Sequence, residues 1–243
     1  MKTEAWTRAV RGQLDLGRLL PLGGPDDGTW ITEQAAVRAL WPTAADIPGV
    51  RPERMRIGPA PHEPVAEPAV RPPASALPPG PLRIEAAFTA SLTQPVHQAA
   101  EQLRTALLDG AAERLGLTAV AVDLRLTDLH EGPEKPPSKA PPARSSASSA
   151  ETRPLRGPIG ELADVASAVP GVARLTAPLG GRPVRVEEQD DPPGRHIQVQ
   201  LAVAPGHHPL EVARAVRTAV TAVPASDTRG PVTVAVLVTE VGV

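Results

Sequence analysis

A strand–helix–strand pattern that occurs twice limits what this chain can fold into more than any other feature. In the C-terminal copy, apolar residues alternate with polar or small ones over residues 197–203, as in a half-buried strand. Apolar residues at three- and four-residue steps then predict a helix over residues 209–223, and alternation returns over residues 232–238. Strand, helix and strand of this length are typical of a βαβ unit.

The first copy lies upstream at a nearly constant spacing. Ile84 corresponds to Ile197, a shift of 113 residues, and Val122 corresponds to Val234, a shift of 112 residues. A Pro-Gly-Val tripeptide, itself preceded by a short helical pattern, comes before both copies. We interpret this order as a tandem duplication. The alternative is two unrelated α/β pieces in a chain rich in Ala and Val.

The predicted fold class is α+β, with two tandem domains that are each a three-stranded mixed sheet with helices on one face. A hairpin makes the first two strands antiparallel, and a helical crossover makes the third strand parallel to the second. Whether the third strand lies beside the first or the second stays open. We expect an N-terminal amphipathic segment over residues 1–28, a first domain over residues 29–130 with a proline-rich insertion at 59–81, a disordered linker over residues 131–154 and a second domain over residues 155–243.

Two helix ends are marked by individual residues. Thr32 is a suitable N-cap for a helix that runs through Leu40. The helix that follows Pro95 is expected to end by Leu115, where Gly116 can cap it in a left-handed conformation.

The order helix, Pro-Gly-Val, strand, strand, helix, strand resembles the alkaline-shock-protein family of bacterial envelope-stress proteins. The fullest match covers residues 159–241, and residues 31–127 are similar to a more diverged copy. Within the fuller match, the motif is residues 169–172 and the closing strand carries Val234, Val236 and Val238. The resemblance implies a cytoplasmic, non-catalytic scaffold at the inner face of the cell envelope. Its partner would be a small membrane-anchored protein or a paralogous alkaline-shock-like protein, so membrane contact would be indirect at most.

Composition excludes several classes of function. The chain has no cysteine, which excludes disulfides and thiolate metal sites. A net charge of −2 gives no general attraction to nucleic acid. Aromatic residues make up 2% of the chain, so Trp30 and Trp41 are expected to add bulk to aliphatic cores. No signal peptide and no apolar run near the roughly 20 residues of a membrane span is visible, which predicts a soluble cytoplasmic protein.

Two surfaces are the candidates for protein contacts. One is the strand over residues 197–203, which we expect at a sheet edge where strand addition would allow self-association. The other is an amphipathic helix near the N-terminus, which either packs on the first domain or docks on a partner or a membrane surface. The residues of these candidate surfaces are Ile197, Val199, Leu201 and Val203, and Trp6, Val10 and Leu14.

The signals for chemistry are weak, and we expect no catalytic residue, no cofactor and no metal. An alternative is a metal-binding or small-molecule sensor or enzyme that uses the His207-His208 turn with His196 in a cleft between the domains. Acidic pairs at residues 187–188 and 190–191 are interpreted as a charged hairpin rather than an acid/base cluster. A further alternative is a KH-like nucleic-acid module, although the Gly-x-x-Gly clamp and stacking aromatics of such modules are missing.

Overall fold

The computed structural model describes residues 17–131, 157–178, 182–190, 193–224 and 230–242. Its helices are α2 (Glu33–Ala45), α3 (Val96–Gly110), α4 (Pro158–Ser167) and α5 (Pro209–Thr221), and a π-helical turn, η1 (Ala111–Leu115), continues α3. Its strands are β1 (Leu19–Pro21), β2 (Thr29–Thr32), β3 (Val50–Pro59), β4 (Leu82–Ser91), β5 (Ala119–His130), β6 (Val172–Leu175), β7 (Val184–Asp190), β8 (Pro193–Val203) and β9 (Val232–Val241). The predicted α+β class is confirmed.

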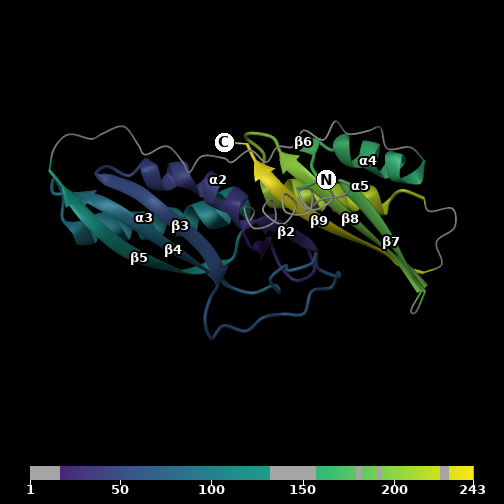
Figure 1. Ribbon diagram of the computed structural model, residues 1–243, viewed down its shortest axis with the longest axis horizontal. Helices are drawn as coiled ribbons and strands as arrows, with labels where there is room; N and C mark the ends of the chain where they lie inside the picture. Colours follow the sequence, from purple (N-terminus) through teal and green to yellow (C-terminus); the bar gives the residue numbers. More distant parts are fainter. Residues whose placement is uncertain (1–16, 132–156, 179–181, 191–192, 225–229, 243) are drawn as a thin grey trace, which may run out of the picture.

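The strands form two separate sheets, which lie side by side along the long axis of the molecule (Figure 1). Sheet B has the order β3-β4-β5, with β3 antiparallel and β5 parallel to β4. Sheet A has the order β1-β2-β9-β8-β6. β6 pairs with residues 201–203 of β8, and β7 pairs with residues 193–199 of the same strand. In both sheets the strand that follows the helical crossover lies beside the second strand of the hairpin, which settles the point that the sequence left open.

The two halves repeat the same pairing register. Ile84 pairs with Val122 in sheet B, and Ile197 pairs with Val234 in sheet A, at the spacing read from the sequence. The parallel ladder is also interrupted at equivalent places, directly after Phe88 in β4 and directly after its counterpart in β8. The predicted strands at residues 197–203 and 232–238 are therefore confirmed within β8 and β9.

The first half also contributes two strands to the sheet of the second half. β1 and β2 form a hairpin, and β2 pairs in parallel with the outer edge of β9, where Ile31 lies beside Val238. All four residues of β2 are buried, so this strand needs cover on both faces and a partner for its backbone. Thr29–Thr32 therefore belongs to sheet A, whereas the sequence prediction assigned residues 29–130 to a domain of their own. One continuous apolar core also runs through both halves, so the structure does not confirm two tandem domains with separate interiors.

Helix α2 follows β2 without a loop and joins the two sheets. Thr32 caps it as predicted, because its hydroxyl accepts a hydrogen bond from the Ala35 N–H at 3.2 Å. The helix runs past Pro42 to Ala45, beyond the predicted end at Leu40. It packs against β3 and α3 of the first half and against β9 of the second half.

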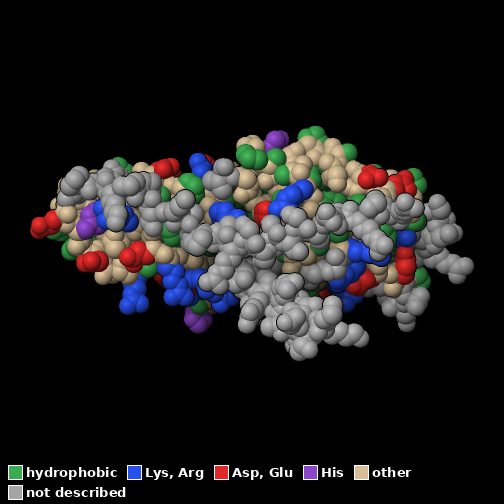
Figure 2. Space-filling view, turned by 45° about the horizontal axis from the view of Figure 1, so that its top comes forward, with side chains coloured by type: hydrophobic (Ala, Val, Ile, Leu, Met, Phe, Trp, Pro, Cys, Tyr) green, Lys and Arg blue, Asp and Glu red, His purple; other side chains and the backbone are tan. Residues whose placement is uncertain are grey.

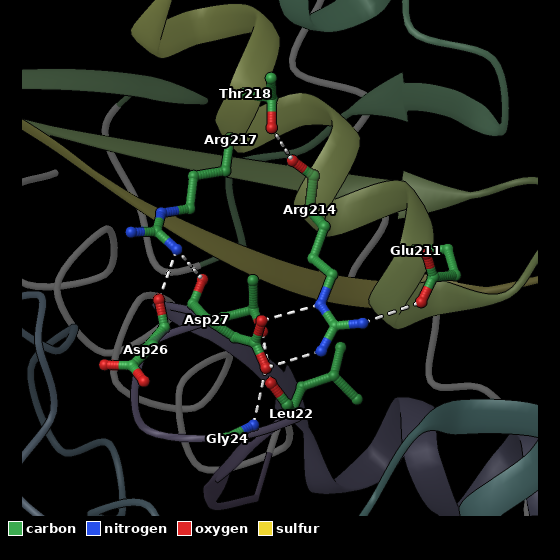
Figure 3. A network of polar contacts seen from close by, with 9 residues as sticks. Leu22, Gly24, Asp26, Asp27, Glu211, Arg214, Arg217 and Thr218 are labelled. Carbon is green, nitrogen blue, oxygen red and sulfur yellow. Dashed lines mark hydrogen bonds and ion pairs between the residues drawn. The ribbon is translucent and has the colours of Figure 1, made fainter.

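The turn between β1 and β2 is held by helix α5 of the second half (Figure 3). Arg214 binds the Asp27 carboxylate, and Arg217 donates to the backbone carbonyls of Asp26 and Asp27. The same carboxylate also accepts the Gly24 N–H at 2.7 Å, which closes the turn. Side-chain contacts far apart in sequence therefore fix the hairpin on sheet A.

The proline-rich insertion crosses the outer face of sheet A, below the junction of the sheets in Figure 1. Val70 is buried against Leu19, Trp30 and the outward-facing residues of β9. The Trp30 indole Nε1 donates to the Leu77 carbonyl at 3.3 Å. The predicted proline-rich insertion is thus packed around Val70 and Ala76, where it covers an apolar sheet face that would otherwise meet water.

None of the helices in the described residues is both long and apolar enough to cross a membrane.

Candidate functional site

β5 is the longer of the two edge strands of sheet B. β5 has 12 residues and pairs with β4 on one side, and within the described residues no strand pairs with its other side. Its counterpart β9 is paired on both sides, by β8 and by β2. The two halves thus present the same edge, open in one and occupied in the other (Figure 1).

The occupied edge shows how a strand is received. Trp30 of β2 lies beside Leu237, and the Val236 N–H donates to the Gly28 carbonyl at 3.0 Å. The Val236 N–H therefore points away from β8 and toward the added strand. Leu124 is the counterpart of Val236. Leu124 pairs with Ala86 of β4, and Val236 pairs with Val199, which is the equivalent residue of β8. From this equivalence we infer that the Leu124 N–H and C=O point outward from β5.

Apolar side chains are exposed along the open edge. Leu126 is 38% exposed, whereas its counterpart Val238, covered by β2, is 0% exposed. Leu129 and Val120 are 43% and 50% exposed. Three of the five large apolar side chains that are exposed in the described part of the chain therefore lie on this one strand, which is the composition expected of a contact surface.

The other face of β5 carries charges of both signs. Arg83 of β4 forms ion pairs with Glu85 at 2.6 Å and with Asp123 at 3.1 Å. Arg125 lies two residues further along β5, on the same face as Asp123. A carboxylate and a guanidinium at this spacing can both meet opposite charges on an added strand.

Two local irregularities limit the regular part of the edge. The register of β5 against β4 shifts by one residue at Val120 and again at Thr127, so that β5 carries an extra residue at each place. The Thr127 hydroxyl donates to the Glu53 carboxylate at 2.7 Å and lies 3.0 Å from the Phe88 carbonyl. Bulges of this kind interrupt strand pairing, so residues 121–126 form the regular stretch.

The predicted interaction edge at residues 197–203 is wrong. β8 is a central strand, because β9 pairs with one side and β6 and β7 pair with the other. The four predicted contact residues are at most 2% exposed, and they are Ile197, Val199, Leu201 and Val203. The prediction failed because the parallel third strand adds to the free side of the second strand. The other predicted contact residues, Trp6, Val10 and Leu14, lie outside the described residues.

Of the three histidines of the alternative metal site, His196 and His207 have separate environments, and the Nδ1 of His208 is buried without a hydrogen-bond partner in the described residues. His196 is buried and its Nδ1 lies 3.0 Å from the Thr233 hydroxyl. Burial lowers the pKa of His196, and the nearby Glu187 carboxylate partly opposes this. His207 is exposed with its Nδ1 3.2 Å from the Pro205 carbonyl. Within the described residues no group of three or more His, Cys, Asp or Glu side chains is placed to hold a metal ion.

Glu187 and Glu188 of the β7–β8 hairpin are engaged in ion pairs. Glu187 binds Arg71 of the proline-rich insertion at 3.2 Å, and Glu188 binds Arg195 of β8 at 2.7 Å. These carboxylates therefore link segments of the chain, which agrees with their interpretation as a charged hairpin.

A small hollow lies between helices α4 and α5. It is lined by Leu162, Ile197 and Val220 among others, with Arg195 and Glu161 at its polar side, and its volume is about 30 Å³. Such a volume holds about one water molecule, and ligand pockets are larger by an order of magnitude. This hollow is not a small-molecule site.

The chain matches no protein-family model and no curated protein sequence.

The sequence contained part of the signal for the β5 edge. The apolar alternation through Val122, Leu124 and Leu126 matches the closing strand of the second half. It does not reveal that β2 covers only one of the two equivalent edges, because that depends on the path of residues 19–32 in space.

Proposed function

We propose that the protein is a non-catalytic scaffold that acts through protein–protein contacts, and that the outer edge of β5 is its binding surface. The observation that carries the proposal is the difference between two equivalent edges, of which β9 receives β2 while β5 is open and flanked by exposed apolar side chains. Main-chain hydrogen bonds along such an edge supply affinity, and alternate side chains supply specificity.

The occupied edge indicates the chemistry of the partner. β2 carries apolar Ile31 beside Val238, on the face that looks toward the core. A strand added to β5 would place an apolar residue beside Leu126 in the same way. The resemblance to alkaline-shock proteins supports a location at the cytoplasmic face of the cell envelope, with a membrane-anchored protein or a paralogue as partner.

The geometry favours the alternative functions less. The hollow near α4 and α5 is too small for a substrate, and His196 lies in a different hydrogen-bond environment from His207. Figure 2 shows both blue and red side chains on the face in view. The chain carries a net charge of −2, whereas nucleic-acid binding relies on basic residues that neutralise phosphates.

Site-specific photo-crosslinking in cells tests the proposal. A photoreactive amino acid replaces Leu129 or Val120, which are exposed at opposite ends of β5, and the control replaces Val65, which is 60% exposed in the proline-rich insertion. We expect protein adducts from both β5 positions and none of the same partner from residue 65. An extended partner would be attached at points roughly nine residues apart in its own sequence, since paired strands advance together.

Leu126→Lys is the disrupting substitution in this experiment. It places a charge where the partner's apolar residue would lie, so both adducts should be lost while the control pattern stays unchanged. Adducts at unrelated positions of many proteins, or adducts that persist with Leu126→Lys, would contradict strand addition at β5.

A further inference from the structure

We propose that the strand received by β5 is β5 of a second copy of this chain, in antiparallel orientation, with the two-fold axis at Leu124. The two copies of sheet B would then form one continuous six-stranded sheet. This inference rests on the proposed function of the β5 edge and names its occupant.

The backbone geometry of β5 permits this register. The N–H and C=O of Leu124 point outward by equivalence with Val236. In an antiparallel pair, residues that both point toward the partner exchange two hydrogen bonds. A two-fold axis at Leu124 places Leu124 opposite its own copy, and Val122 opposite Leu126, so every outward-pointing residue meets another.

The side chains distinguish this register from its neighbours. With the axis at Leu124, Asp123 of each copy lies opposite Arg125 of the other, which gives two pairs of opposite charge. Moving the axis by one residue places Arg125 opposite Arg125 or Asp123 opposite Asp123, and like charges directly opposite each other are destabilising. The apolar face matches as well, because Val122 of one copy meets the exposed Leu126 of the other.

Arg83 supports the same arrangement. Its guanidinium already contacts Asp123 at 3.1 Å from the β4 side. Arg125 has no ion pair among those of the described residues, and in the dimer it approaches the same carboxylate from the opposite side. Asp123 thus lies between two guanidinium groups, and Glu85, which also pairs with Arg83, offsets the added positive charge.

The other edge of sheet B is closed to addition, so the pairing stops at two copies. β3 contains Pro52 and Pro59, which lack the N–H that an added strand needs. The Glu33 carboxylate already accepts the Ile57 N–H at 3.0 Å. The bulges at Val120 and Thr127 further confine the paired region of β5. These features predict a discrete dimer rather than an open fibre.

Cysteine crosslinking tests the register directly, because the chain has no cysteine of its own. Two copies of Leu124→Cys would have their Cα atoms about 5.5 Å apart in a hydrogen-bonded pair, which suits a disulfide. Two copies of Val120→Cys would lie about 27 Å apart, since they are eight residues out of register. With oxidised glutathione as the oxidant, we expect a linked dimer from Leu124→Cys and none from Val120→Cys.

Charge exchange gives an independent test on the full chain in solution. The dimer has twice the mass of the 25.3 kDa chain and is measured by sedimentation over a range of concentrations. In Arg125→Asp, residue 125 of each copy places a carboxylate opposite Asp123 of the other copy. This repulsion occurs twice in the dimer and should raise the dimer dissociation constant about tenfold. The double variant Asp123→Arg with Arg125→Asp restores opposite charges at both pairs, and should return the constant part of the way to that of the parent, because Arg83 loses its ion pair with residue 123.

The outcomes separate this inference from the proposed function. A chain that stays monomeric at all concentrations, with Leu124→Cys unlinked, overturns the second copy as occupant. A dimer that is insensitive to Arg125→Asp also overturns it. In either case, adducts between β5 and a different protein would leave the proposed scaffold function standing. A linked dimer without any other partner in cells would support the inference and contradict a heterologous scaffold.

Discussion

Arg214 binds Asp27 through two hydrogen bonds, from Nε to Oδ1 at 2.7 Å and from Nη2 to Oδ2 at 3.0 Å, across 187 residues of sequence. The same guanidinium reaches Glu211 at 2.9 Å (Figure 3). The hydrogen bond from Arg214 holds the pKa of Asp27 below its usual value, although burial of the carboxyl opposes this shift. This pair fixes the β1–β2 turn on α5, and thereby holds β2 at the edge of β9.

Asp27→Asn should weaken the fold in a manner that depends on pH. Because the pKa of Asp27 is lowered in the folded state, its stabilisation is present above the pKa of the unfolded chain and is lost as pH falls through the folded pKa. We expect a loss of about 1 kcal/mol at pH 7, since Arg214 is partly exposed, and a smaller loss near pH 3. Urea unfolding at both values measures this.

Asp26→Asn is the matched control for that variant. In the network of Figure 3, Asp26 contributes its backbone carbonyl to Arg217, which the substitution retains. The control should unfold like the parent at pH 7. Equal effects of the two substitutions would show that the Asp27–Arg214 pair does not hold the hairpin.

Gly116→Ala should be more destabilising than Gly206→Ala. Both glycines have positive φ values, +81° and +79°, so each substitution costs about 1 kcal/mol of backbone strain. A Cβ at residue 116 would also lie 2.7 Å from Leu210 Cδ2, whereas a Cβ at residue 206 meets nothing within 4 Å. Overpacking adds about 2 kcal/mol, which thermal unfolding of the two variants should resolve. Equal losses would contradict the close packing of α5 on the end of η1.

Glu33→Gln should destabilise the junction of α2 with β3. The carboxylate is almost fully buried, accepts the Ile57 N–H at 3.0 Å and pairs with Arg56 Nε at 2.9 Å. The Gln amide oxygen can still accept both hydrogen bonds, but without the charge that strengthens them, and its NH2 group cannot accept the Arg18 N–H that donates to Glu33 Oε2 at 3.2 Å. The substitution should lower the unfolding free energy by about 2 kcal/mol. Glu63→Gln makes the same change at an exposed residue of the proline-rich insertion and should have no measurable effect in urea unfolding.

Val70→Ala should loosen the proline-rich insertion from sheet A. Val70 is buried against Trp30 and β9, so removal of two methyl groups should cost about 1.5 kcal/mol of local stability. Limited proteolysis should then cleave residues 60–81 faster than in the parent. Val65→Ala, at a position that is exposed, should leave the rate unchanged. Rapid cleavage of the parent itself would contradict the packed insertion.

The part of the fold that both halves share could be predicted, because the sequence signals for it are local. Thr32 caps α2, and Gly116 ends the turn η1 with a φ of +81°, both as the sequence predicted. The register from Ile84 to Val122 recurs in sheet A because alternating apolar residues must face the helices in both copies.

The interaction site could not be predicted in the same way. The exposed Leu126 and the buried Val238 occupy equivalent positions with similar flanking sequence. They differ because β2 pairs with one strand and not the other, and pairing between segments about 200 residues apart leaves no periodic pattern that a single sequence reveals.

The sequence by itself determined the two sheet-and-helix units, the parallel and antiparallel directions of their strands, and the aliphatic character of the core. It left open which strand lies beside the third. Those properties follow from side-chain periodicity, which acts within one element or between neighbouring elements. Only the tertiary structure decided that β1 and β2 join the second sheet, that the proline-rich insertion covers its outer face, and that β5 is left open within the described residues. Each of these depends on which buried surface remains uncovered after the local elements form, and burial is a property of the assembled molecule.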